Sequence, residues 1–89
     1  MTLSGFNKLD LTNQIDFVTH SLDVFLIATR CTGDFLIGLY DYDLFFIEAH
    51  FNPENDLIFA IDGISFDHPH VDLYIDQMVQ VEQYGEYQY

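Results

Sequence analysis

Four short runs rich in aromatic and β-branched residues occupy the middle of the chain, and they constrain its fold more than any other feature. The runs are VFLIATRC (24–31), DFLIGLY (34–40), LFFIEAHF (44–51) and LIFAIDGI (57–64). Only short segments of turn-forming residues separate them. Such runs favour strands, and links this short join antiparallel neighbours, because a parallel crossover needs about a dozen residues or more. The sequence therefore predicts a four-stranded antiparallel meander.

Apolar residues at helical spacing lie on both sides of these strands. Ahead of the strands, an N-cap at Asp10 precedes an apolar stripe, which predicts a helix from about Asp10 to Ser21. This stripe consists of Leu11, Ile15, Val18 and Leu22. A second stripe, after the strands, consists of Val71, Ile75 and Met78. Pro69 suits the first turn of this second helix, and Ser65 or Asp67 is its expected N-cap.

These elements give the order α-β-β-β-β-α in one α+β domain over residues 1–82, near the lower end of the sizes that fold on one core. With 49% hydrophobic residues, the chain has enough apolar side chains for such a core. We expect the N-terminal and the C-terminal helix to pack on one face of the meander. Residues 83–89 have no apolar periodicity and are expected to form a frayed, acidic, tyrosine-rich tail.

Side chains alternate between the two faces of a strand, so the turn lengths decide which residues share a face. We pair Tyr40 with Leu44 and Phe51 with Leu57. One face is then apolar throughout and suits the helices; it carries Phe35, Ile37, Leu39, Phe45, Ile47, Ala49, Phe51, Leu57, Phe59 and Ile61. The opposite face mixes apolar and polar side chains, and its predicted interface residues are Arg30, Tyr40, Phe46, Glu48, His50, Ile58 and Asp62.

This mixed face has too many large apolar residues for a surface that only meets water. Two helices hardly cover both faces of four strands. We therefore expect the mixed face to pack against another protein, most simply in a homodimer. The alternative is that one helix crosses to that side and buries it within the monomer.

The chain carries a formal net charge of −13, with fifteen acidic residues against Lys8 and Arg30. Direct binding to nucleic acid or to an anionic membrane needs basic surface, so neither is an expected partner. A basic protein surface is the natural complement, although charge of this kind also serves solubility alone. The acids on the predicted hairpin loops form the rim expected to face such a partner: Asp41, Asp43, Glu54 and Asp56.

Glu48, His50 and Arg30 are the candidates for chemistry on the mixed face. A carboxylate beside an imidazole forms a general acid–base pair, and an arginine holds an anion. No nucleophile and no glycine-rich phosphate loop accompanies them in the sequence. The interpretation that we favour is a structural ion pair between Arg30 and Glu48, with His50 in water near the end of the sheet. We therefore expect no enzymatic activity and no cofactor.

The segment DHPH (67–70) places two histidines around a proline. A metal site needs three or four converging ligands, and here Asp67 or His50 would have to complete the set. The turn chemistry of a helix start explains the same residues. No metal site is therefore predicted, and His68 and His70 are the candidate ligands if one exists.

The single cysteine, Cys31, excludes an internal disulfide and suits a reducing compartment. The N-terminal residues MTLSGFNKLD lack the basic and apolar regions of a signal peptide. No apolar run approaches the roughly 18 residues of a membrane span. The cytoplasm is therefore the expected compartment.

Several segments resemble a group of short, uncharacterised bacterial proteins. They are VFLIATR, LY, LFFIEAHFNPENDLI and YID, in this order, within about residues 10 to 80. In that group a strand similar to F-L-A-x-R precedes one similar to F-F-V-E-V-x-Y, followed by a turn and N-x-I. The resemblance implies the α-β-β-β-β-α order and draws attention to Arg30 and Glu48, but it implies no activity. This chain departs from the group at His50-Phe51 and in its acidity.

These patterns predict a non-enzymatic acidic domain that binds a basic partner protein. In the sharpest version, the domain is an inhibitor that mimics the charge of nucleic acid on a basic surface. Two alternatives stay open. One is a small ligand-binding or enzymatic domain that uses Glu48, His50 and Arg30, and the other is a dimeric structural subunit.

Overall fold

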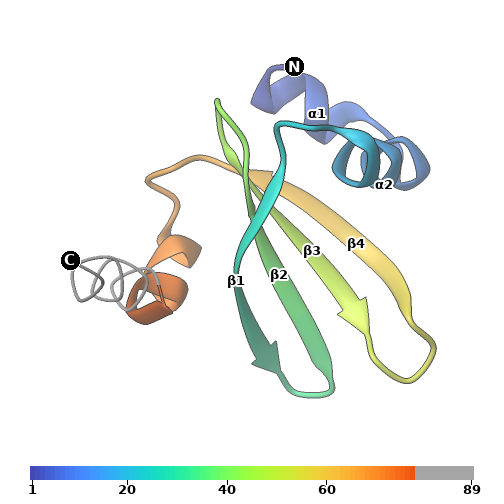
Figure 1. Cartoon of the computed structure of the whole chain (residues 1–89), viewed down its shortest axis with the longest axis vertical. Coiled ribbons are helices and arrows are strands. Elements are labelled where there is room, and N and C mark those ends of the chain that lie inside the picture. Colours follow the sequence, from blue (N-terminus) through green and yellow to red (C-terminus); the bar gives the residue numbers. More distant parts are fainter. Residues whose placement is uncertain (78–89) are drawn as a thin grey trace.

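The computed structural model describes residues 1–77 and contains two N-terminal helices, a four-stranded sheet and a short C-terminal 3-10 helix (Figure 1). The elements are α1 (Leu3–Lys8), α2 (Leu11–His20), β1 (Phe25–Thr32), β2 (Phe35–Asp41), β3 (Phe46–Asn52), β4 (Leu57–Ile64) and η1 (Pro69–Tyr74). The predicted α+β class is confirmed. The predicted tail, 83–89, and the end of the second predicted helix lie outside the described residues.

The helix ends follow from local capping. Asp10 is the N-cap of α2, as predicted, and its side chain accepts a 2.9 Å hydrogen bond from the amide of Asn13. The first helix, α1, was not expected from periodicity; Thr2 caps it by accepting a 2.9 Å bond from the amide of Gly5. The N-cap of η1 is His68.

The predicted cap of this last helix, Ser65 or Asp67, is wrong. The His68 Nδ1 atom accepts a 3.0 Å bond from the amide of His70 and so occupies the capping position. The side chains of Ser65 and Asp67 bond each other instead, at 2.7 Å.

The sheet is an antiparallel meander with the strand order β1-β2-β3-β4, as predicted. The predicted pairing of the strands is wrong at two turns. Tyr40 pairs with Ile47 rather than with Leu44, because β2 continues to Asp41 and the β2–β3 loop then has four residues, 42–45, instead of three. Phe51 pairs with Ile58 rather than with Leu57, next to an irregularity in the register of β3 and β4.

These pairings assign the side chains to two faces, since directly opposite residues in a sheet point to the same side. The face covered by α1 and α2, called here the α face, carries Leu26, Leu36, Gly38, Tyr40, Ile47, Ala49, Phe51, Ile58 and Ile61. The face covered by η1, the η face, carries Ala28, Arg30, Ile37, Leu39, Phe46, Glu48, His50, Asp62 and Ile64. Tyr40 and Ile58 were predicted to share a face with Glu48, and this placement is wrong.

The helices cover both faces, so the prediction that they pack on one face is also wrong. Phe6 of α1 and Val18 of α2 are buried in a cluster with Ile47 and its neighbours on the α face. Tyr74 of η1 is buried in a second cluster with Ala28, Leu39 and Ile64 on the η face. One helix therefore crosses to the side that carries Glu48, as in the alternative, although the residues predicted for the mixed face are divided between the two faces.

Both outer strands are capped along their open edges by a side-chain amide. Asn7 of α1 accepts a 2.7 Å bond from the Gly63 amide and donates a 3.0 Å bond to the Gly63 carbonyl, on β4. Gln77 makes the same pair of bonds with the backbone of Thr29, on β1. Each side-chain amide thus supplies the hydrogen bonds that a neighbouring strand would make at that residue. Unpaired backbone groups at a sheet edge invite the addition of another strand, and the amide satisfies them at this position.

The helices leave part of the sheet open. Figure 1 shows α1 and α2 at one end of the sheet, whereas the β1–β2 and β3–β4 turns lie at the other end. On the α face, Leu36, next to the β1–β2 turn, is 36% exposed, and Leu26, near the start of β1, is 54% exposed. None of the helices within residues 1–77 is long and apolar enough to cross a membrane.

Candidate functional site

Glu48 lies at the centre of the η face and is 1% exposed. Its Oε2 atom accepts a 2.6 Å hydrogen bond from the Tyr74 hydroxyl, and its Oε1 atom lies 2.8 Å from Nδ1 of His70. Arg30 approaches Oε2 with Nη2 at 3.5 Å and donates a 3.0 Å bond from Nε to the Tyr74 hydroxyl. A carboxylate buried this deeply is tolerated because charged and hydrogen-bonding groups surround it.

Three separate segments bring these groups together. Glu48 is in the middle of β3, and Arg30 reaches it diagonally from β1 across β2, where Arg30 is opposite Ile37 and Glu48 is opposite Leu39. Tyr74 and His70 come from η1, whose entry is fixed by the His68 cap and by Pro69. The guanidinium carbon of Arg30 also lies 5.4 Å from the centre of the Tyr74 ring, a cation–π contact.

The electrostatics of the cluster favour one protonation state. Burial raises the pKa of Glu48, but the hydrogen bonds from Tyr74 and His70 and the charges of His70 and Arg30 lower it by more, so the pKa lies below its ordinary value. Burial and the bond to Glu48 raise the pKa of Tyr74 to about 12. At neutral pH the carboxylate is therefore ionised and the phenol is protonated, so Tyr74 donates to Glu48.

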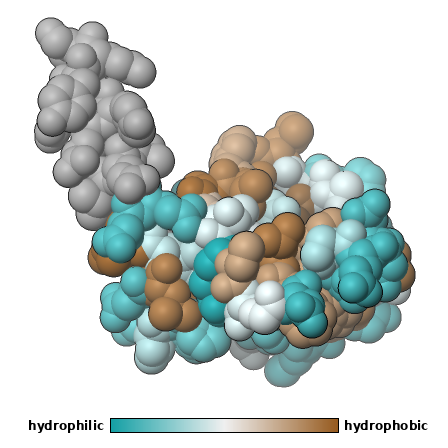
Figure 2. All heavy atoms as spheres, turned by 90° about the horizontal axis from the view of Figure 1, so that it is seen from below, coloured by the Kyte–Doolittle hydropathy of each residue, from teal (hydrophilic) through white to brown (hydrophobic). Residues whose placement is uncertain are grey.

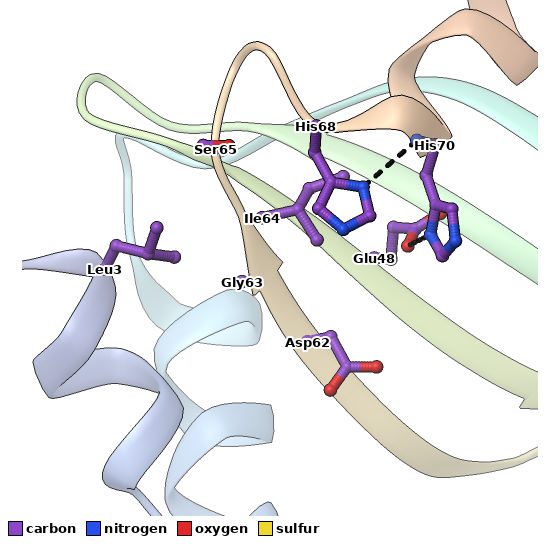
Figure 3. A pocket seen from close by; sticks show the side chains of 8 residues that line it. All are labelled: Leu3, Glu48, Asp62, Gly63, Ile64, Ser65, His68 and His70. Atoms are coloured by element: carbon purple, nitrogen blue, oxygen red, sulfur yellow. Dashed lines mark hydrogen bonds and ion pairs between the residues drawn. The ribbon is translucent and has the colours of Figure 1, made fainter.

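An open cavity of about 360 Å³ adjoins the cluster (Figure 3). Its polar lining includes Glu48, Asp62, His68 and His70, and the rings of the two histidines are 4.5 Å apart. In Figure 3, the side chains of Glu48 and His70 point toward each other, whereas Asp62 points away from them. Within residues 1–77 no three histidine, cysteine or acidic side chains are arranged to hold a metal ion.

The sequence indicated part of this site correctly. Arg30 and Glu48 are in contact, as expected, but the imidazole beside Glu48 belongs to His70 rather than to His50. His50 lies near the ring of Phe59, and its Nδ1 atom is buried without a hydrogen-bond partner among residues 1–77. Phe46 and Asp62 share the η face with Glu48.

Tyr74 was not predicted for the site at all. The only signal for it was its place beside Ile75 of the second apolar stripe, and that stripe does not tell which face of the sheet the helix covers.

The acids of the predicted rim do not form one surface. Asp41 and Asp43 lie at the β2–β3 connection, and Glu54 and Asp56 lie at the β3–β4 turn, at the opposite end of β3. All four are exposed, but the structure separates them into two pairs. Glu54 instead lines a hollow with Asp34 of the β1–β2 turn.

No family model, no curated protein and no solved structure matches this chain. The resemblance to short bacterial proteins therefore stays a prediction.

Proposed function

We propose that this protein is a non-enzymatic interaction domain that binds a basic surface of another protein. The observation that carries the proposal is the distribution of charge on the fold. Every aspartate and glutamate within residues 1–77 is exposed except Glu48. Of the two cationic residues, Arg30 is paired with the buried Glu48, so Lys8 is the sole strongly cationic side chain outside an ion pair in the described part of the chain.

A surface so uniformly anionic attracts cationic partners over distances of about a Debye length, roughly 8–10 Å at physiological salt. Such attraction raises the rate of association and suppresses binding to other acidic surfaces. The sharper form of the proposal is that the partner's basic surface normally binds nucleic acid, for which this domain substitutes its carboxylates. The homodimer expected from the sequence remains an alternative use of the exposed apolar residues.

The test is affinity capture on the immobilised domain with a salt gradient, with immobilised polyglutamate as the matched control. The expected result is a small set of basic proteins that polyglutamate does not retain and that salt releases. If the same proteins elute identically from both columns, folded structure contributes nothing and the proposal fails. For any DNA-binding protein in the set, the domain should displace its DNA in a competition assay.

A second candidate function rests on the contact between His70 and Glu48. A carboxylate 2.8 Å from Nδ1 fixes the orientation of the imidazole of His70, which lines the 360 Å³ cavity. Such an imidazole is able to take a proton from a bound ligand or from water. Hydrolysis of p-nitrophenyl acetate by the protein and by its His70→Gln variant tests this, with His20→Gln on α2 as the control. Equal rates of hydrolysis by the native protein and both variants would exclude a catalytic role for His70.

A further inference from the structure

We propose that two adjoining hollows, one on the α face and one between the hairpin turns, bind a segment of the partner in which a lysine or arginine stands next to a large apolar residue. This inference rests on the proposed function and specifies where and how the basic partner docks. One hollow is apolar and the other is acidic, and they share Leu36 as a common wall.

The apolar hollow lies on the part of the α face that the helices leave open. It has a volume of about 170 Å³, and its walls are formed chiefly by Leu26, Leu36, Phe51 and Ile58, which come from all four strands. Gly38 creates the depth, since a Cβ atom at this position would lie 3.1 Å from Cδ1 of Leu26 and 3.2 Å from Cε1 of Tyr40. The hollow is smaller than the roughly 300–1,000 Å³ of pockets for drug-sized ligands, and it suits a single side chain.

The acidic hollow lies between the two hairpin turns. It has a volume of about 320 Å³ and is lined by Asp34 of the β1–β2 turn and by Pro53 and Glu54 of the β3–β4 turn. Both carboxylates are exposed, and neither forms an ion pair within residues 1–77. Figure 2, which views the molecule from this end, shows hydrophobic residues directly beside hydrophilic ones.

Two occupants of these hollows are compared, a second copy of this chain and a basic segment of another protein, and their charge decides between them. A second copy of the chain would bring a further net charge of −13 against the first, and the cations it offers are few. Within the described residues these are Lys8 on α1 and Arg30, which is paired with Glu48 on the η face. A basic segment of another protein supplies the missing charge, and an adjacent apolar side chain fills the apolar hollow. Its main chain need not add to the sheet, because Asn7 and Gln77 already occupy positions on both edges.

The first experiment measures binding of a short acetylated peptide of alternating lysine and leucine, with lysine–serine and glutamate–leucine peptides of equal length for comparison. We expect the lysine–leucine peptide to bind at least about tenfold more tightly than either of the others. Equal binding of the lysine–leucine and lysine–serine peptides would overturn the apolar hollow while leaving the proposed function intact. Capture of basic proteins on the whole domain tests that function separately.

The second experiment uses paired variants of the protein. The double variant Asp34→Asn with Glu54→Gln and the double variant Asp41→Asn with Asp43→Asn remove the same charge from opposite ends of the sheet. We expect the first to weaken binding of the lysine–leucine peptide about tenfold and the second to change it less than about twofold. Equal weakening by both would show that only bulk charge matters, and the docking site would be wrong.

The apolar hollow has its own matched pair of variants. Leu26→Ser should weaken binding of the peptide, whereas Leu73→Ser, at a leucine of similar exposure on η1, should not; the two are 54% and 56% exposed. Both variants keep the net charge of the protein, so a difference in their affinity for the peptide reports the contact between the peptide and the apolar hollow. If sedimentation instead shows a dimer that Leu26→Ser dissociates, a second copy is the occupant and the inference is overturned.

Discussion

Tyr74 and Glu48, 26 positions apart in the sequence, are joined by a 2.6 Å hydrogen bond that fastens η1 to the sheet. Both side chains are almost fully buried, and Arg30 contacts each of them. The bond is therefore a buried polar contact, with Arg30 and His70 beside it, where η1 packs on the apolar residues Ala28, Leu39 and Ile64. Loss of this hydrogen bond should therefore weaken the packing of η1 on the η face.

Replacement of Tyr74 by phenylalanine keeps the ring and removes the bond to Glu48. The buried carboxylate then loses its shortest partner, so we expect the free energy of unfolding to fall by about 1–3 kcal/mol. Urea denaturation measures this difference. Tyr42→Phe is the control, because the ring of Tyr42 packs against Phe17 and Phe45 through its faces and edges. An equal loss in both variants would refute the importance of the Tyr74 hydroxyl.

Alkaline titration should reveal Tyr74 directly. The pKa of Tyr74 is raised from 10.0 to about 12 in the folded protein, so its protonated form stabilises the fold. That contribution is complete below about pH 10 and is lost as the pH rises through about 12. Tyrosinate absorbance should therefore show a late-titrating phase that is absent from Tyr74→Phe and from the denatured protein. The absence of such a phase in the native protein would contradict the burial of this hydroxyl.

The pKa of Glu48 is shifted in the opposite direction to that of Tyr74, so its contribution to stability should be lost in acid rather than in alkali. Its pKa is lower in the fold than the ordinary value of 4.5, so the ionised carboxylate stabilises the fold above about pH 4.5. That contribution is lost as the pH falls through the lower folded-state pKa. The stability difference between the native protein and Glu48→Gln should therefore be largest near neutral pH and should shrink below pH 4.5.

Glu54→Gln, at an exposed acid of the β3–β4 turn, is the control for this titration. The Glu54 side chain makes no ion pair within residues 1–77, so the stability difference between the native protein and Glu54→Gln should not shrink below pH 4.5 as it does for Glu48→Gln. A difference for Glu48→Gln that grows as the pH falls would refute the assigned direction of the pKa.

The order of the elements could be read from the sequence because it depends on local signals. The strand segments 24–31, 34–40, 44–51 and 57–64 nearly coincide with β1 to β4, and Asp10 caps α2 as predicted. The register could not be read in the same way. Phe45 looks like the second residue of a strand, but it is a buried loop residue packed on Phe6 and Tyr42. One extra loop residue moved Tyr40 to the other face.

The composition of the site depended on contacts that no local pattern contains. Arg30 and Glu48 were recognised because polar residues are unusual in apolar strands. Tyr74 and His70 were not assigned to Glu48, because their position depends on the path of residues 65–68 around the end of the sheet. An apolar stripe predicts that a helix packs on a sheet, but it does not predict on which face.

The amide of Asn7 offers a last test, which concerns the edge of β4. Asn7→Ala removes two hydrogen bonds to Gly63 and leaves the backbone of that residue open to solvent or to another chain. We expect a loss of about 1–2 kcal/mol in the free energy of unfolding, together with faster formation of thioflavin-binding aggregates, because an uncovered edge pairs with other strands. Asn13→Ala is the matched control: at that position the backbone amide makes the capping bond to Asp10. If both variants aggregate at the rate of the native protein, the high net charge alone protects the sheet and the amide cap is dispensable.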